Sequence, residues 1–135
     1  MDIVKLAALP FRYRPWRPRH VRLIAADMFR PANGEQLAHD VHLKAAIDWL
    51  CRAQDARDGK KDQGGVSAGW SFEDGWLPGY PETTGYFIET FLAAADVLRR
   101  PELTTRARRM LDWELSIQLP DGAFPGHFGE AGSRP

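Results

Sequence analysis

The residues best suited to chemistry lie between Gly64 and Tyr86, in the run GGVSAGWSFEDGWLPGYPETTGY. This run combines carboxylates with large aromatic rings and contains no Lys or Arg. Because sugars present apolar C–H faces and a rim of hydroxyl groups, carbohydrate sites combine flat aromatic platforms with carboxylates. We expect the platforms to come from this run and from a second glycine-rich run near the C-terminus: Trp70, Trp76, Tyr80, Tyr86 and Phe124. The sequence therefore predicts an oligo- or polysaccharide as the partner.

The candidate catalytic groups are carboxylates in the same two runs, together with one imidazole. They are Glu73, Asp74, Glu82, Asp121 and His127. Glycoside cleavage requires two carboxyl groups, one as a general acid and the other as a base or nucleophile. Since adjacent side chains diverge, we expect a working pair to join Glu73 or Asp74 to Glu82 or Asp121. A structural interpretation stays open for each: Glu82 can stabilise a helix N-terminus, Asp121 can close a turn, and His127 can pack within its loop.

Length and composition indicate one globular domain. The chain has 135 residues, of which 44% are hydrophobic and 27% charged, values typical of a soluble folded protein. No stretch approaches the roughly 20 apolar residues of a membrane span, so we expect a cytoplasmic protein. Residues 1–30 carry seven Lys or Arg and two Asp, and residues 31–135 carry eleven Lys or Arg and sixteen acidic residues. Neither part has the charge pattern of a nucleic-acid-binding surface. Cys51, the single cysteine, is expected to be a buried thiol.

Residues 1–33 are predicted to form a basic, aromatic lead-in to the helical region. Basic residues alternate there with aromatic residues or proline, as in the run FRYRPWRPRH at 11–20. Pro15 and Pro18 exclude a helix interior and disfavour a central strand. We expect an extended segment whose aromatic rings pack on the body, and an alternative is an arm whose arginines bind an oxyanion. Residues 21–29 fit one short helix or strand.

Three helices are predicted in the rest of the chain. They run from Glu35 to Ala56 behind a cap at Asn33, from a cap at Thr83 or Thr84 to Leu98, and from Pro101 to Leu119. The first helix is expected to bury a stripe of Leu37, Val41, Ala45 and Trp49, widened by Ile47, Leu50 and Ala53. The third is expected to bury Leu103, Ala107, Met110, Leu111 and Leu115, with Trp113 and Ile117 alongside. The second is apolar on nearly all sides, which predicts burial between other helices. The glycine-rich run between the first two helices is predicted to contain no regular element.

The first and third predicted helices end in the same way. Asp-Trp followed by Gln54 recurs 64 residues later as Asp-Trp followed by Gln118, and each glutamine precedes a glycine turn. The unit is a helix, a glycine-rich loop and a second helix, and a repeat of this kind indicates an array of helical hairpins. We expect each glutamine to hydrogen-bond the loop that follows it.

This pattern of helix, glutamine, glycine turn and hydrophobic residue resembles the repeats of α/α-toroid proteins. These include squalene cyclases, protein prenyltransferases and six-hairpin carbohydrate-active enzymes. The segment from DWLCRAQD to GWSFEDGWLPGYPETTGYFIETFL is most similar to bacterial toroid proteins encoded near polysaccharide-biosynthesis genes. The resemblance covers residues 36–130 and implies an all-α fold, in which residues 34–135 supply about one and a half hairpins of an incomplete toroid. Since a toroid needs more hairpins than these, the resemblance also implies that copies of the chain associate or that the chain is part of a longer protein.

The resemblance implies a carbohydrate-active or glycan-binding protein of a polysaccharide pathway. If the chain is an enzyme, we expect a glycoside hydrolase, lyase or epimerase activity. One alternative is terpenoid cyclase or prenyltransferase chemistry, in which aromatic faces stabilise carbocations, although the DxDD motif of squalene cyclases is absent. Another is a non-catalytic helical assembly module. No cofactor or metal is expected, because Cys51 and His127 lack a third ligand at recognisable spacing and no phosphate-binding glycine motif occurs.

Overall fold

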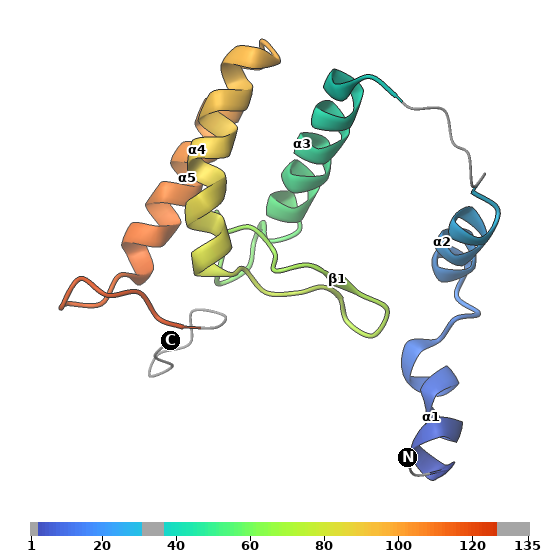
Figure 1. The fold of residues 1–135 in the computed structure, drawn as a ribbon. Helices are drawn as coiled ribbons and strands as arrows, with labels where there is room; N and C mark the ends of the chain where they lie inside the picture. Colours follow the sequence, from blue (N-terminus) through green and yellow to red (C-terminus); the bar gives the residue numbers. More distant parts are fainter. Residues whose placement is uncertain (1–2, 31–36, 127–135) are drawn as a thin grey trace.

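A computed structural model describes residues 3–30 and 37–126, and the fold in these ranges is mostly helical (Figure 1). In chain order the elements are α1 (Ile3–Tyr13), α2 (Pro18–Met28), α3 (His39–Asp55), β1 (Trp70–Ser71), β2 (Gly75–Trp76), α4 (Pro81–Val97) and α5 (Glu102–Ile117). The mostly helical structure confirms the predicted all-α class. No helix in the described ranges has the length and apolar character needed to cross a membrane.

The N-terminal region is helical, so the prediction of an extended segment was wrong, whereas the short helix allowed for residues 21–29 is found as part of α2. Pro15 lies in the break between α1 and α2, and Pro18 occupies the first position of α2, where a missing N–H costs nothing. The prolines therefore delimit two helices instead of preventing them. His20 is fully buried and fixes the corner, because its Nδ1 donates to the carbonyl oxygens of Tyr13 and Arg14 at 3.1 and 2.9 Å.

Helix α3 begins later than predicted and buries a different face. It starts at His39 behind Ala38, whereas the predicted cap and start, Asn33 and Glu35, lie outside the described residues. The predicted stripe was partly wrong: Val41 and Trp49 are exposed, whereas Ile47 and Ala53, which also belong to it, are buried. The buried positions are Ile47, Cys51, Ala53 and Gln54. This face is chosen by a tertiary partner, because α5 packs beside it and bonds to Gln54. The prediction of a buried Cys51 thiol is confirmed.

Helices α4 and α5 pack side by side as a hairpin (Figure 1). The cap of α4 is Tyr80, so the predicted caps Thr83 and Thr84 were wrong; Thr84 is instead buried and accepts a hydrogen bond from the Val66 amide at 3.0 Å. The core of the hairpin contains Phe91, Ala94, Ala95, Leu103, Ala107 and Met110. The prediction that α4 is buried on nearly all sides was wrong, because the side chains of Tyr86 and Val97 are about 70% exposed.

The glycine-rich run contains a small antiparallel hairpin, although no regular element was predicted there. Strands β1 and β2 pair Trp70 with Trp76 and Ser71 with Gly75, and a further bridge joins Ser67 to Gly79. We call residues 67–79 the aromatic hairpin. Gly75 has a φ of +78°, a conformation that suits the turn between the strands and that residues with a Cβ seldom adopt.

A buried ion pair anchors the base of the aromatic hairpin. The Arg57 guanidinium donates to both carboxylate oxygens of Asp62 at 2.8 Å and to the Leu77 carbonyl at 3.0 Å. The Gly79 amide donates to the same carboxylate. Burial alone would raise the pKa of Asp62, but these hydrogen bonds and the Arg57 charge outweigh it, and the pKa lies below its ordinary value.

We expect Arg57→Ala to lower the free energy of unfolding by about 3–5 kcal/mol, because it leaves the Asp62 carboxylate buried without its counter-ion. In the wild type, the stability that Asp62 contributes is complete above the ordinary Asp pKa of about 4 and is lost as the pH falls through the lower pKa of the fold. Urea unfolding followed by circular dichroism at several pH values measures both effects. Arg52→Ala, at an exposed position of α3, is the control; equal losses in the two variants would contradict the prediction.

Candidate functional site

A cavity of about 630 Å³ lies between the N-terminal half of α4, the C-terminal half of α5 and the turn that follows α5. In Figure 1 this turn lies at the same end of the hairpin as the start of α4. The walls are mostly apolar or aromatic, with two carboxylates among them. The lining residues are Tyr80, Pro81, Glu82, Gly85, Ile88, Leu111, Glu114, Ala123, Phe124, Pro125 and Gly126. We call this the α4–α5 cavity.

Local hydrogen bonds place Phe124 on the wall of this cavity. Gln118, at the end of α5, donates from its side chain to the Gly122 carbonyl at 2.9 Å, and Asp121 accepts from the Ala123 amide at 3.1 Å. Gly122 has a φ of +87°, which lets the chain reverse here. The same arrangement occurs after α3, where Gln54 donates to the Gly64 carbonyl at 3.0 Å. The predicted role of both glutamines is therefore confirmed.

Glu114 is the unusual group in the α4–α5 cavity. It is 6% exposed, and its Oε1 has no hydrogen-bond partner among the described residues. Burial in these apolar surroundings raises the pKa of Glu114 to about 7. The other carboxylate, Glu82, is exposed in the first turn of α4, where the helix dipole favours negative charge. The cavity thus contains two carboxyl groups in opposite environments, an arrangement that separates a proton donor from a base.

The structure brings together only some of the predicted site residues. Tyr80, Glu82 and Phe124 line the α4–α5 cavity, and Asp121 lies in the adjoining turn. Glu82 also occupies the first turn of α4 and Asp121 also closes a turn, as their structural interpretations require. His127 lies outside the described residues.

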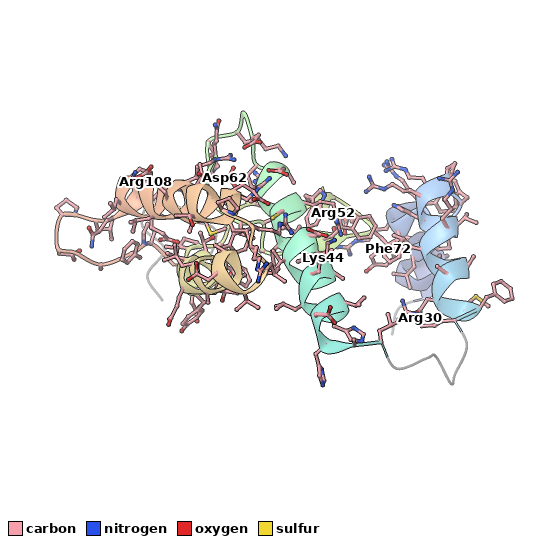
Figure 2. All side chains as sticks on the ribbon, turned by 90° about the horizontal axis from the view of Figure 1, so that it is seen from above. Arg30, Lys44, Arg52, Asp62, Phe72 and Arg108 are labelled. Carbon is pink, nitrogen blue, oxygen red and sulfur yellow. The ribbon has the colours of Figure 1, made fainter. Side chains whose placement is uncertain are left out.

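A second group of predicted residues lies at the tip of the aromatic hairpin, next to α1 and α2. Trp70 makes edge contacts with His20 and Phe72 at centroid distances of 5.7 and 5.1 Å, and Arg19 lies 4.9 Å from its ring. Figure 2 shows Phe72 reaching toward these helices. Glu73 pairs with Arg12 of α1 at 2.8 Å.

The remaining predicted residues lie neither on the wall of the α4–α5 cavity nor at the tip of the aromatic hairpin. The rings of Trp76 and Trp49 are 5.2 Å apart, so Trp76 packs on α3. Tyr86 projects from α4 and is 69% exposed. Asp74 is exposed at the hairpin turn, where its amide donates to Ser71 Oγ at 2.9 Å. The structure therefore does not unite Glu73 or Asp74 with Glu82 in one cluster.

The sequence analysis missed Glu114, Ile88 and the role of Leu111 as a cavity wall. One signal was present in the repeat: at the offset of 64 residues Glu114 takes the place of Leu50. A carboxylate at a position that is apolar in the other copy points to a function other than packing. Among the described residues, no group of three or more His, Cys, Asp or Glu side chains is placed to hold a metal ion.

Comparisons of the chain with protein-family models, with curated proteins and with solved structures find no match. The site therefore has to be interpreted from its own chemistry.

We expect Glu114→Gln to stabilise the protein at pH 8 but not at pH 4. The carboxyl ionises near 4.5 in the unfolded chain and near 7 in the fold, so above pH 7 the folded state keeps a destabilised, buried charge. The difference corresponds to about 3 kcal/mol of unfolding free energy, which appears progressively between these two pH values.

Urea unfolding of both proteins across pH 4–8 measures this effect. Glu89→Gln, at an exposed position of α4, serves as the matched control and should leave the pH dependence unchanged. Parallel pH profiles for the wild type and Glu114→Gln would show that Glu114 is not a buried acid.

Proposed function

We propose that this chain is a carbohydrate-active or glycan-binding protein of a polysaccharide pathway, and that the α4–α5 cavity is its binding site. One observation carries the proposal: a buried, unpaired Glu114 shares a cavity with the exposed Glu82 and the rings of Tyr80 and Phe124. The rings can stack on apolar sugar faces, and the carboxyl groups can accept or donate hydrogen bonds at the hydroxyl rim.

The two carboxyl groups suit acid–base chemistry on a sugar. With a pKa of about 7, Glu114 holds its proton near neutral pH and can donate it to the glycosidic oxygen as the bond to the anomeric carbon breaks. Glu82 can act as the base that takes a proton from the attacking water. A lyase or epimerase reaction would use the same residues, with Glu82 removing a proton from carbon. The proposal thus includes Glu114 as acid and Glu82 as base.

The repeat supports a helical-hairpin array of the α/α-toroid type as the framework of this site. Gln54 and Gln118 make the same bond to the loop that follows each helix, to Gly64 and to Gly122. Both of these glycines have positive φ values, +102° and +87°. The equivalence therefore extends from sequence to backbone conformation.

The apolar walls favour a second candidate ligand. Pro81, Ile88, Leu111 and Pro125 supply no hydrogen bond from their side chains. A prenyl or terpenoid chain gains from burial against such walls, whereas a sugar has to pair its hydroxyl groups. This candidate corresponds to terpenoid cyclase or prenyltransferase chemistry.

We expect neutral or acidic oligosaccharides to shift the NMR signals of the Tyr80 and Phe124 rings in a saturable way. Phe124→Ala should weaken binding about tenfold or more, because it removes an apolar ring face that the bound ligand would cover. Tyr86→Ala removes an exposed ring from the same helix pair outside the cavity and should leave affinity unchanged. Glu114→Gln should retain binding and abolish any cleavage of the oligosaccharide.

A parallel titration with farnesol separates the two candidates. Shifts of Tyr80 and Phe124 with farnesol alone would replace the glycan proposal by the terpenoid one. If neither ligand moves these signals, the cavity is not a binding site for either class.

A further inference from the structure

Helices α1 and α2 expose an unusual number of large apolar side chains. Phe11, Met28 and Phe29 are 74%, 72% and 81% exposed. Others in the same region are also exposed: Leu9, Tyr13, Trp16, Val21, Leu23 and Ile24. So many exposed apolar side chains within two short helices indicate an interaction surface rather than an ordinary protein–water boundary.

The apolar side chains of α2 form one stripe. Val21, Ala25 and Met28 follow the i, i+4, i+7 spacing that places them on one face of a helix, with Ile24 beside them. His20 points elsewhere, since it is buried against Trp70 and Phe72 of the aromatic hairpin. The stripe is therefore free on the side away from this contact. In Figures 1 and 2, α1 and α2 stand apart from α4 and α5.

The same segment carries arginines without a carboxylate partner among the described residues. Arg12 pairs with Glu73 and Arg19 stacks on Trp70, but no described carboxylate pairs with Arg14, Arg17 or Arg22. Within residues 3–30 the only acidic residue is Asp27. Arg19 and Arg22 also line an open groove of about 690 Å³ with Leu23 and Trp70, which places two guanidinium groups beside an apolar wall.

We propose that α1 and α2 bind the surface of an anionic lipid bilayer, lying in the interface without crossing it. Charge and shape select this occupant. A helix with arginines on one side and exposed Trp, Phe and aliphatic residues on the other is suited to the boundary between head groups and acyl chains. The guanidinium groups pair with lipid phosphates, while Trp16, Met28 and Phe29 enter the apolar layer. A nucleic acid would satisfy the arginines but would leave the apolar stripe in water.

The contact with the aromatic hairpin fixes the orientation of this surface. Arg12–Glu73, Arg19–Trp70 and the buried His20 hold α1 and α2 by one side. The opposite side then meets the membrane, and the α4–α5 hairpin stays on the aqueous side. This inference does not depend on the proposed glycan site, since it involves other residues.

Flotation of the full chain with lipid vesicles tests the proposal. We expect binding to vesicles that contain phosphatidylglycerol, little binding to pure phosphatidylcholine, and weaker binding as the salt concentration rises. The combined variant Arg14→Gln, Arg17→Gln, Arg22→Gln should reduce the partition coefficient about a hundredfold, at about fivefold for each arginine. The matched control Arg52→Gln, Arg99→Gln, Arg108→Gln changes three exposed arginines elsewhere and should have less than about a threefold effect.

The apolar part of the surface is tested separately. Met28→Ser with Phe29→Ser should reduce partitioning at least about tenfold, whereas Leu92→Ser with Val97→Ser, exposed on α4, should not change it. Acyl chains that carry bromine should quench tryptophan fluorescence on binding, and Trp16→Phe should remove most of this quenching. Thermal melts establish that each variant is folded, as expected for exposed positions.

Three outcomes would overturn the proposal. These are absence of vesicle binding, equal binding to neutral and anionic vesicles, or equal losses in the test and control variants. Light scattering adds a fourth outcome. If the chain forms a dimer but binds no vesicles, and if Met28→Ser with Phe29→Ser dissociates this dimer, the surface is a contact between copies of the chain.

Discussion

The side-chain amide of Gln54 is the contact on which the arrangement of the helices depends. It is fully buried at the end of α3 and donates to the carbonyl oxygens of Gly64 and Arg106, while its oxygen accepts from the Arg106 guanidinium at 3.0 Å. One side chain therefore joins α3, the loop after it and α5. Because a buried amide without partners costs about 1–3 kcal/mol, these elements are held in one relative arrangement. Asp55 pairs with Arg106 of α5, and Asp48 pairs with Arg100 in the connection before α5; solvent weakens both ion pairs.

Close packing makes the glycine-rich run rigid, although its composition suggests freedom. A Cβ at Gly65 would lie 2.8 Å from ring atoms of Trp113, so only glycine permits this approach. The next residue, Val66, is buried and bonds to Thr84, and Ser67 donates to Leu77 at 2.7 Å. The base of the aromatic hairpin is thus fixed by α4 and α5, and its tip can carry Trp70 to helices α1 and α2. The orientation of the N-terminal helices follows from contacts made far from them in sequence.

Periodicity and the pairing of buried polar groups were the dependable parts of the sequence analysis. They predicted the helices that became α3, α4 and α5 and the bonds of Gln54 and Gln118. The buried face of α3 was predicted only in part, because Val41 and Trp49 fit a helical stripe as well as Ile47 and Ala53 do. Only the packing of α3 in the core with α4 and α5 decides between them. Pro15 and Pro18 lie outside helix interiors as predicted, but the extended segment expected around them was wrong, because proline is tolerated at a helix start. For the site, Tyr80, Glu82 and Phe124 were predicted, but their meeting with Glu114 depends on the docking of α4 against α5.

The repeat explains why the cavity lies where it does. At the offset of 64 residues, Leu111 and Leu115 correspond to Ile47 and Cys51. Ile47 and Cys51 are 1% and 7% exposed, whereas Leu111 and Leu115 are 44% and 58% exposed. The difference is tertiary, since Ile47 and Cys51 join a core cluster with residues of α4 and α5, whereas Leu111 and Leu115 remain outside it. Glu114 takes the place of the partly buried Leu50 and is itself only 6% exposed. The change therefore places a buried carboxyl group beside the cavity, where burial raises its pKa.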